Sequence, residues 1–286
     1  MQGSIRSELF FLKQFGFNDN LLQHIFLSGL DPIQVIFKKD IELDISLETL
    51  FSEKEKKISN DFFAYEDFKK NLFVNEAFLV KNNENRIFFK YDVNEITEIV
   101  PEKIIPLFIY CKGDTSLLKK DRKRIAIIGT RNPSKKTIEI TRKLTQKFVN
   151  EDFIIVSGLA EGTDTIAHET ALINNGKTIA ILPTNFNNIY PKSNKKLSDK
   201  ILESGLLLTA IGPKENTYKS SFLERNQYVA NVSDVVLVTE TNLKSGTMNT
   251  IRNASEAEKK ILFVDQNNES INKKIIEFGG EMLSDY

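Results

Sequence analysis

Four loops in the second half of the chain are rich in residue types that hold phosphate groups. Each follows a short apolar segment and precedes a segment with helical periodicity. The loops begin at Gly129-Thr130-Arg131, Ser157-Gly158, Pro183-Thr184-Asn185 and Ser245-Gly246-Thr247. Helix starts offer unpaired backbone N–H groups and a positive dipole end to an anion. Because such loops share the carboxyl edge of a parallel sheet, the pattern predicts a site for a phosphate-bearing ligand there.

The candidate phosphate-binding residues are small or carry hydroxyl groups, and together they would form a cradle of backbone amides. The set is Gly129, Thr130, Ser157, Gly158, Gly162, Ser245, Gly246 and Thr247. Arg131 adds a guanidinium, which can hold a phosphate at two points. For each loop the alternative is an ordinary connection between a strand and a capped helix, with Arg131 as a surface residue.

The segment from Lys219 to Asn226 combines an aromatic side chain with cations. Its pattern predicts a helix that starts at Ser221, with Glu224 completing a capping box. Phe222 would lie at the helix start, with Arg225 close to the same face. Sites for single-stranded nucleic acid stack bases on aromatic rings and pair phosphates with cations. The alternative, weighted equally, places Phe222 in the core and Arg225 on the surface.

The sequence offers no pair of nucleophile and base. Cys111 is the only cysteine, and His24 and His168 are the only histidines, so neither a disulfide nor a Cys or His metal site is expected. We expect His168 to be structural and Asp164 to be an N-cap. The sequence therefore predicts no catalytic residues, no metal ion, no cofactor and no enzyme activity.

Composition predicts a globular protein with an anionic ligand on its second half. The chain has 286 residues, of which 41% are hydrophobic. No apolar stretch is long enough to span a membrane, and the N-terminus does not resemble a secretory signal, so a cytoplasmic location is expected. The formal charge is −5 over residues 1–110 and +5 over the remainder. This asymmetry favours an anionic ligand but is modest.

The expected elements change in character along the chain. Residues 1–70 have helical periodicity, and short strands are expected at 78–80, 86–89 and 106–110, followed by a turn at Lys112-Gly113-Asp114. From residue 125 strands alternate with helices, which implies an α/β fold with a parallel sheet and right-handed crossovers. Helices are expected to start near Ser134, Asp164 and Ser221 and after Gly246.

Five motifs occur in one order, and the ordered set resembles the DNA-processing protein A (DprA, also called Smf) family. They are Gly129-Thr130-Arg131, Ser-Gly-Leu-Ala-x-Gly-x-Asp-x-x-Ala-His from Ser157, Tyr190-Pro191-x-x-Asn194-x-x-Leu197, Phe-x-x-Arg-Asn from Phe222, and Ser245-Gly246-Thr247. Each motif alone is weak, but the order makes the set specific. The resemblance covers about residues 104–286.

This resemblance implies an extended, Rossmann-like, mostly parallel sheet that binds single-stranded DNA. The family works as a homodimer, loads the RecA recombinase during natural transformation, and is not known as a family of enzymes. Carried over by position, the DNA-binding residues would be Arg131, Lys219, Phe222, Arg225 and Asn226. The expected domains are a small helical N-terminal domain over residues 1–70 and a Rossmann-like DNA-binding domain over 71–286.

Gln227 departs from the family pattern, which has a second arginine there, so one phosphate contact is expected to be weaker or absent. The alternative function is a nucleotide-binding sensor or a nucleoside-phosphate hydrolase, since related sheets hold nucleotides at the same edge. The Ser245 loop and Glu256 faintly resemble such sites. Lys219, Phe222 and Arg225 favour DNA, because a small-nucleotide site does not require them.

Overall fold

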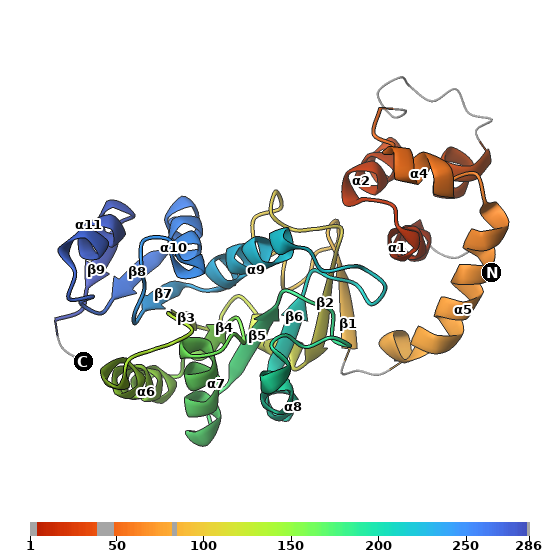
Figure 1. The fold of residues 1–286 in the computed structure, drawn as a ribbon. Coiled ribbons are helices and arrows are strands. Elements are labelled where there is room, and N and C mark those ends of the chain that lie inside the picture. The colour runs from red at the N-terminus through yellow and green to blue at the C-terminus, as the bar shows by residue number, and fades with distance from the viewer. Residues whose placement is uncertain (1–4, 39–48, 82–84, 285–286) are drawn as a thin grey trace.

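The structure is a computed structural model that describes residues 5–38, 49–81 and 85–284. Residues 1–4 and 39–48 of the expected helical domain lie outside the described residues. The described residues of this expected domain, 5–38 and 49–70, are mostly helical, and with residues 71–81 of the last helix they form an N-terminal part that lies at one end of the molecule (Figure 1). Its elements are α1 Ile5–Phe15, α2 Asp19–Ser28, the π-helical turn η1 Gln34–Lys38, α4 Glu53–Ile58 and α5 Phe62–Lys81.

Helix α5 corrects one prediction. It crosses the expected domain boundary after residue 70 and includes residues 78–80, where a strand was expected. The prediction of a strand at 78–80 was wrong because a short apolar run fits a strand or a buried helix equally well. No glycine or proline interrupts the sequence between Phe62 and Lys81, so the helix continues through it.

The described residues form a nine-stranded, mostly parallel sheet, which confirms the expected fold class. Its order is β1-β2-β6-β5-β4-β3-β7-β8-β9, with antiparallel pairing only between β1 and β2 and between β2 and β6. The strands are β1 Asn85–Phe89, β2 Phe108–Gly113, β3 Arg124–Ile128, β4 Ile154–Ser157, β5 Thr178–Leu182, β6 Leu206–Thr209, β7 Val235–Val238, β8 Lys260–Phe263 and β9 Gly280–Met282. The central strands β3, β4 and β5 are buried along their whole length, which is why they are continuous apolar runs.

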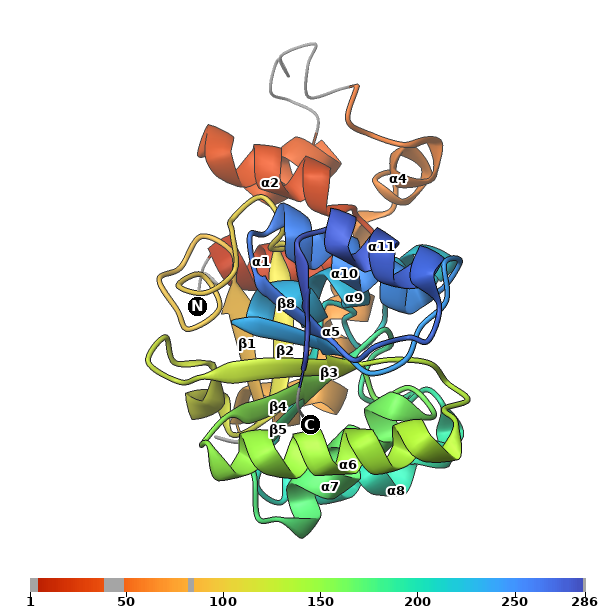
Figure 2. The same cartoon turned by 90° about the vertical axis from the view of Figure 1, so that its left-hand side faces the viewer.

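Helices cover both faces of this sheet (Figure 2). One face carries α6 Lys135–Asn150, α7 Thr163–Ile173 and α8 Lys195–Leu202, and the other carries α9 Lys219–Val232, α10 Gly246–Glu256 and α11 Glu269–Glu277. Two short 3-10 helices, η2 Thr115–Leu118 and η3 Lys192–Asn194, lie in connections. Ser134 caps α6 and Ser245 caps α10, each by accepting a backbone N–H of the first turn. Among the described residues no helix is both long and apolar enough to cross a membrane.

Three local predictions need correction. Lys112 and Gly113 belong to β2, and Asp114 caps η2, so the expected turn begins later. Helix α9 begins at Lys219 rather than Ser221, whose Oγ instead accepts the backbone N–H of Tyr218 at 3.1 Å. Asp164 is not the N-cap of α7 but lies in its first turn, since the helix follows Gly162. Its carboxylate accepts backbone N–H groups of the preceding loop rather than of its own helix.

The N-terminal part packs against the antiparallel end of the sheet. Leu9, Leu12 and Leu21 form one buried cluster with Phe108 and Tyr110 of β2. Many of the chain's aromatic residues gather in this cluster, where edge-to-face pairs such as Phe26 with Phe89 are common. The helical part is therefore joined to the sheet by an apolar interface.

Candidate nucleic-acid interface

A pocket of about 410 Å³ lies beside the carboxyl ends of β3 and β7. These strands are neighbours, but β4 follows β3 on one side whereas β7 lies on the other. The loops after the two strands diverge, and in doubly wound sheets ligands bind in the crevice that this divergence opens. Most of the predicted site residues line the pocket, namely Gly129, Thr130, Arg131, Gly158, Phe222, Arg225, Asn226, Ser245, Gly246 and Thr247.

The loop after β3 is held by its neighbours, while Arg131 stays exposed. Thr247 Oγ1 donates to the Gly129 carbonyl at 2.8 Å, which joins this loop to the start of α10. Gly162 has φ +75°, and a Cβ there would overlap the Arg131 backbone. The sequence predicted Gly162 as part of the phosphate cradle, but it lies behind the pocket and shapes the turn that presents Arg131.

Arg225 forms a buried cation at the pocket, with an exposed fraction of 7%. Its Nη1 donates to the Gly158 carbonyl and lies 3.9 Å from Asp164 Oδ2. The Asp164 carboxylate accepts the backbone N–H groups of Gly158 at 3.1 Å and Ala160 at 3.2 Å. A Cβ on Gly158 would overlap the guanidinium, so only glycine allows this arrangement.

The charges of this region leave a positive excess. Burial lowers the pKa of Arg225, Arg131 lowers it further by like-charge repulsion, and Asp164 opposes both. The carboxylate therefore compensates Arg225 only in part, and a second guanidinium lies near enough to repel it. An anion in the pocket would be attracted by both arginines.

Phe222 is half-buried and lines the pocket, outside the buried core clusters. Its ring meets Tyr190 edge-to-face, with centroids 5.3 Å apart and an interplanar angle of 88°. Tyr190 is 47% exposed. The sequence indicated Tyr190 only as part of a motif. The structure shows that its ring extends the aromatic surface of Phe222 beside the pocket.

Two other predicted residues lie outside the lining. Ser157 is fully buried, and its hydroxyl donates to the Ile127 carbonyl at 2.7 Å, so it joins β4 to β3. Lys219 is exposed on the first turn of α9, three residues before Phe222. Thr241, Asn242 and Thr250 line the pocket but were not predicted. The signal that could have found Thr241 and Asn242 is their place between β7 and the Ser245 loop.

His168 is structural, as predicted. It is fully buried, and its Nδ1 lies 2.7 Å from Thr178 Oγ1. The Thr178 hydroxyl donates to the Ile155 carbonyl, so it accepts from His168, and Nδ1 carries the proton. Burial, with a smaller contribution from Arg225, lowers the pKa of His168 to about 3, so the ring is neutral at physiological pH.

Comparison with known proteins gives one family. A family model described as DNA recombination-mediator protein A matches residues 92–284. The DNA processing protein DprA of Streptococcus pneumoniae is 38% identical over 168 residues, which make up 59% of this chain and 56% of that protein. The DprA of Bacillus subtilis is 34% identical over 159 residues, or 56% of this chain and 53% of that protein. The matched region is about half the length of these relatives.

Solved structures extend the likeness over the fold. The similarity to the X-ray structure of DprA from Streptococcus pneumoniae covers 99% of this chain and 96% of the Streptococcus pneumoniae chain, with a TM-score of 0.69 and 27% identity. A structure of the Helicobacter pylori DNA processing protein A, which concerns its single-stranded DNA binding mode, gives a TM-score of 0.62 and 30% identity. That likeness covers 71% of this chain and 92% of the Helicobacter pylori chain.

Proposed function

Since the chain belongs to the DNA recombination-mediator protein A family, we propose that it binds single-stranded DNA in the pocket beside β3 and β7. One observation carries the proposal: the half-buried ring of Phe222 shares this pocket with the guanidinium groups of Arg131 and Arg225. Unpaired bases stack on aromatic rings, while duplex bases remain inside their own stack. The single-stranded DNA binding described for the Helicobacter pylori relative supports the same ligand class.

A nucleotide in this pocket would use three kinds of group. The exposed Arg131 pairs with a phosphate, and the α10 start at Gly246 and Thr247 adds backbone N–H groups that a helix leaves unpaired. The base stacks on Phe222, beside Tyr190. None of these three contacts reads a base edge, so binding has little sequence preference.

The proposed partners follow from membership of a family of recombination mediators. We propose that a homodimer of this protein delivers bound DNA to a RecA-type recombinase in the cytoplasm. Self-association is supported by Ile276 and Met282, apolar residues that are 55% and 45% exposed at the β9 end of the sheet. Ile276→Arg should then halve the mass measured by light scattering, whereas an unchanged mass would exclude this surface.

The two acids weighed for the nucleotide-hydrolase alternative lie outside the pocket lining, and Asp164, which does line it, accepts backbone N–H groups of Gly158 and Ala160. Glu240 Oε2 accepts the backbone N–H of Ser134 at 3.1 Å, and Glu256 is exposed at the far end of α10. Neither lines the pocket. We therefore expect no release of free base from nucleoside monophosphates. Release at enzymatic rates that Glu240→Gln abolishes would favour the alternative.

The test is a titration of labelled oligothymidylate, followed by fluorescence anisotropy, against the same strand paired with its complement. We expect tighter binding of the single strand, with an affinity that falls as salt rises, by a logarithmic slope of about 0.7 for each phosphate contact. Lys219→Ala, which changes an exposed side chain, should weaken binding without affecting folding. Equal affinity for duplex, or an affinity independent of salt, would reject the proposal.

A further inference from the structure

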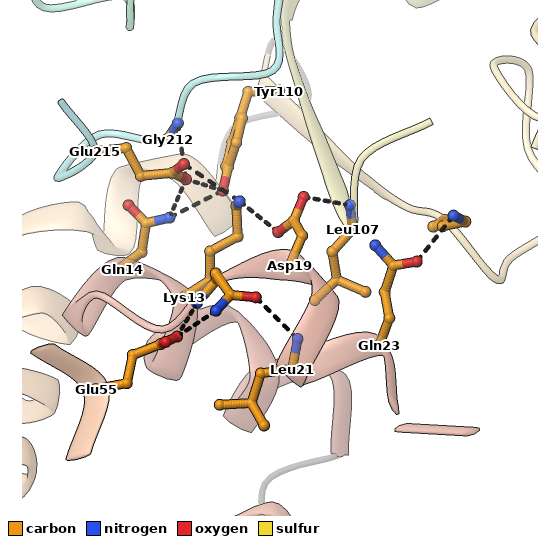
Figure 3. Close-up of polar contacts among 12 residues, drawn as sticks. Lys13, Gln14, Asp19, Leu21, Gln23, Glu55, Leu107, Tyr110, Gly212 and Glu215 are labelled. Carbon is orange, nitrogen blue, oxygen red and sulfur yellow. Dashed lines mark hydrogen bonds and ion pairs between the residues drawn. The ribbon is translucent and has the colours of Figure 1, made fainter. Parts of the chain in front are cut away.

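A cluster of buried polar residues joins the N-terminal helical part to the loop that precedes α9 (Figure 3). We call Lys13, Gln14, Asp19, Tyr110 and Glu215 the junction cluster. Lys13 Nζ lies 2.5 Å from Asp19 Oδ1 and 3.3 Å from Glu215 Oε2. Gln14 Nε2 donates to Tyr110 Oη at 3.0 Å and to Glu215 Oε1 at 3.1 Å. Three distant parts of the sequence therefore meet in one hydrogen-bonded network.

Lys13 and the two acids of the junction cluster, Asp19 and Glu215, depend on one another. Lys13 is 8% exposed and Gln14 is 4% exposed. Burial acts to lower the pKa of Lys13, but Asp19 and Glu215 outweigh it, so the pKa is raised and the charge is kept. Removing one partner from such a group leaves an uncompensated charge, which is why these networks hold their parts in one arrangement.

Glu215 of the junction cluster lies in the loop between β6 and α9, residues 210–218, which contains no helix or strand. We call this segment the β6–α9 loop. Gln14 Oε1 accepts the backbone N–H of Lys214 at 3.0 Å, and Glu215 Oε1 accepts that of Gly212 at 3.1 Å. The sheet side adds a longer contact, 3.5 Å from Asn185 Nδ2 to the Pro213 carbonyl. The sheet side also holds the start of the loop, where the backbone N–H of Ile211 donates to Thr209 Oγ1 at 3.0 Å, whereas Gln14 of the helical part holds the middle of the loop at Lys214 and Glu215.

The loop leads directly into the first turn of α9, which carries two of the proposed DNA-binding residues. Lys219 begins the helix four residues after Glu215, and Phe222 follows. Further along, α9 is fixed independently, because Arg225 is held by the Gly158 carbonyl. The junction cluster thus acts on the start of α9, at Lys219 and Phe222, rather than on the Arg225 end of the pocket.

We propose that Lys13 and Gln14 are positioning residues for DNA binding: through Glu215 they fix the β6–α9 loop, and with it the placement of Lys219 and Phe222. The proposal rests on the proposed function and adds a role for the helical part, whose described residues (5–38 and 49–81) do not line the pocket. Since coupling between two sites is reciprocal, bound DNA in turn stabilises the contact of the helical part with the loop.

The experiment compares Lys13→Met with Lys69→Met in the full chain. Lys69 pairs with Glu8 at 2.6 Å within the helical part, so its loss perturbs that part without touching the loop. We expect Lys13→Met to weaken oligothymidylate binding about fivefold or more and to speed amide hydrogen exchange over residues 210–218. Lys69→Met should leave both close to the parent values. Equal effects of the two variants on affinity and exchange would overturn the proposal.

Two further measurements separate positioning from general destabilisation. The chain has no tryptophan, so Tyr218→Trp places a single tryptophan, which can be excited selectively, at the N-cap of α9. Its emission should shift when Lys13→Met is added and not with Lys69→Met. In a double-mutant cycle, Lys13→Met should cost less affinity in a Lys219→Ala background, whereas full additivity would show that it does not act through Lys219.

Gln14→Met keeps the test valid should Lys13→Met fail to fold. It removes the hydrogen bonds to Glu215 and to the Lys214 N–H while Lys13 keeps both carboxylates. It should also weaken binding and speed exchange over the loop, and parent values for both would overturn the proposal. Failure of the proposed function is distinguishable, because the parent and Lys69→Met proteins would then not prefer single-stranded DNA.

Discussion

Two buried cations, Lys13 of α1 and Arg225 of α9, are compensated in different ways. Lys13 has two carboxylates, at 2.5 Å and 3.3 Å, whereas Arg225 has one at 3.9 Å and a backbone carbonyl. Burial acts to lower both pKa values. The two carboxylates raise the pKa of Lys13 nevertheless, while that of Arg225 remains lowered.

The difference separates a structural charge from one available to a ligand. Two acids compensate Lys13, and it serves to hold the helical part against the sheet and the β6–α9 loop. Arg225 has a single carboxylate at 3.9 Å, and the guanidinium of Arg131 lines the same pocket and repels it. An anion that entered this pocket would gain from both guanidinium groups, so we expect the weaker pairing of Arg225 to favour phosphate binding.

The largest effect on stability is expected from Lys13→Met. Loss of the ammonium group leaves Asp19 and Glu215 without their cation at a mostly buried position, which should lower the free energy of unfolding by about 3 kcal/mol. Urea denaturation measures the change, with Lys195→Met as control, because Lys195 and its partner Asp199 are more than half exposed. If the two variants lose equal stability, the junction cluster does not hold the helical part.

Arg225→Ala should lower both DNA affinity and stability, whereas Arg131→Ala should lower DNA affinity alone. Without Arg225, the Gly158 carbonyl and the Asp164 carboxylate lose a buried partner, so both DNA affinity and stability should fall, the latter by about 2 kcal/mol. Without the exposed Arg131, affinity should fall while stability stays within about 0.5 kcal/mol. Thermal melts and DNA titrations on the same samples check this. Parent-like DNA binding by Arg131→Ala would remove that residue from the site.

Phe222→Ala tests stacking against a core role. If the ring stacks on a base, DNA affinity should fall by about 2 kcal/mol with little change in stability. Tyr190→Ala is the matched variant, since Tyr190 contacts the same ring from outside the pocket lining, and it should cost less affinity. A stability loss of about 3–5 kcal/mol with unchanged affinity would return Phe222 to the core.

His168 should give stability a pH dependence that appears only below neutral pH. Its folded pKa of about 3 lies below the ordinary value of 6.5, so the unfolded chain takes up a proton first as pH falls. This contribution to stability is complete above pH 6.5 and is lost progressively toward pH 3. His168→Gln should therefore show a flatter fall over that range in denaturant titrations. Identical slopes for parent and variant would exclude the buried neutral histidine.

Local sequence determined much of the fold and most of the pocket. The apolar runs of β3, β4 and β5 require burial on both faces, and Ser134 and Ser245 satisfy the first N–H groups of the helices that follow them. Each of these signals acts within a few residues of the strand or helix that it specifies. Once the strands are parallel, the loops after them share an edge, so Gly129, Gly158 and Gly246 meet without further information.

Local signals failed where a side chain serves a distant or preceding segment. Asp164 looks like a helix cap, but its carboxylate accepts N–H groups of the preceding loop and faces Arg225. Ser221 and Glu224 have capping-box spacing, yet the helix starts two residues earlier. Residues 78–80 fit a strand or a helix, and the uninterrupted α5 decides between them. A pattern of a few residues does not show which backbone or side-chain groups will lie near a given side chain in the folded protein.

Apolar periodicity and turn residues act locally, so the sequence was enough to predict an α/β sheet with loops rich in Gly, Ser and Thr at one edge. Which cations have a carboxylate partner, by contrast, depends on contacts between distant parts of the folded chain. Gln14 and Glu215 are 201 residues apart, and Arg225 reaches a carbonyl 67 residues away. Desolvation and ion pairing depend on what surrounds a charge in space, so Lys13 became a structural cation and Arg225 became part of the pocket.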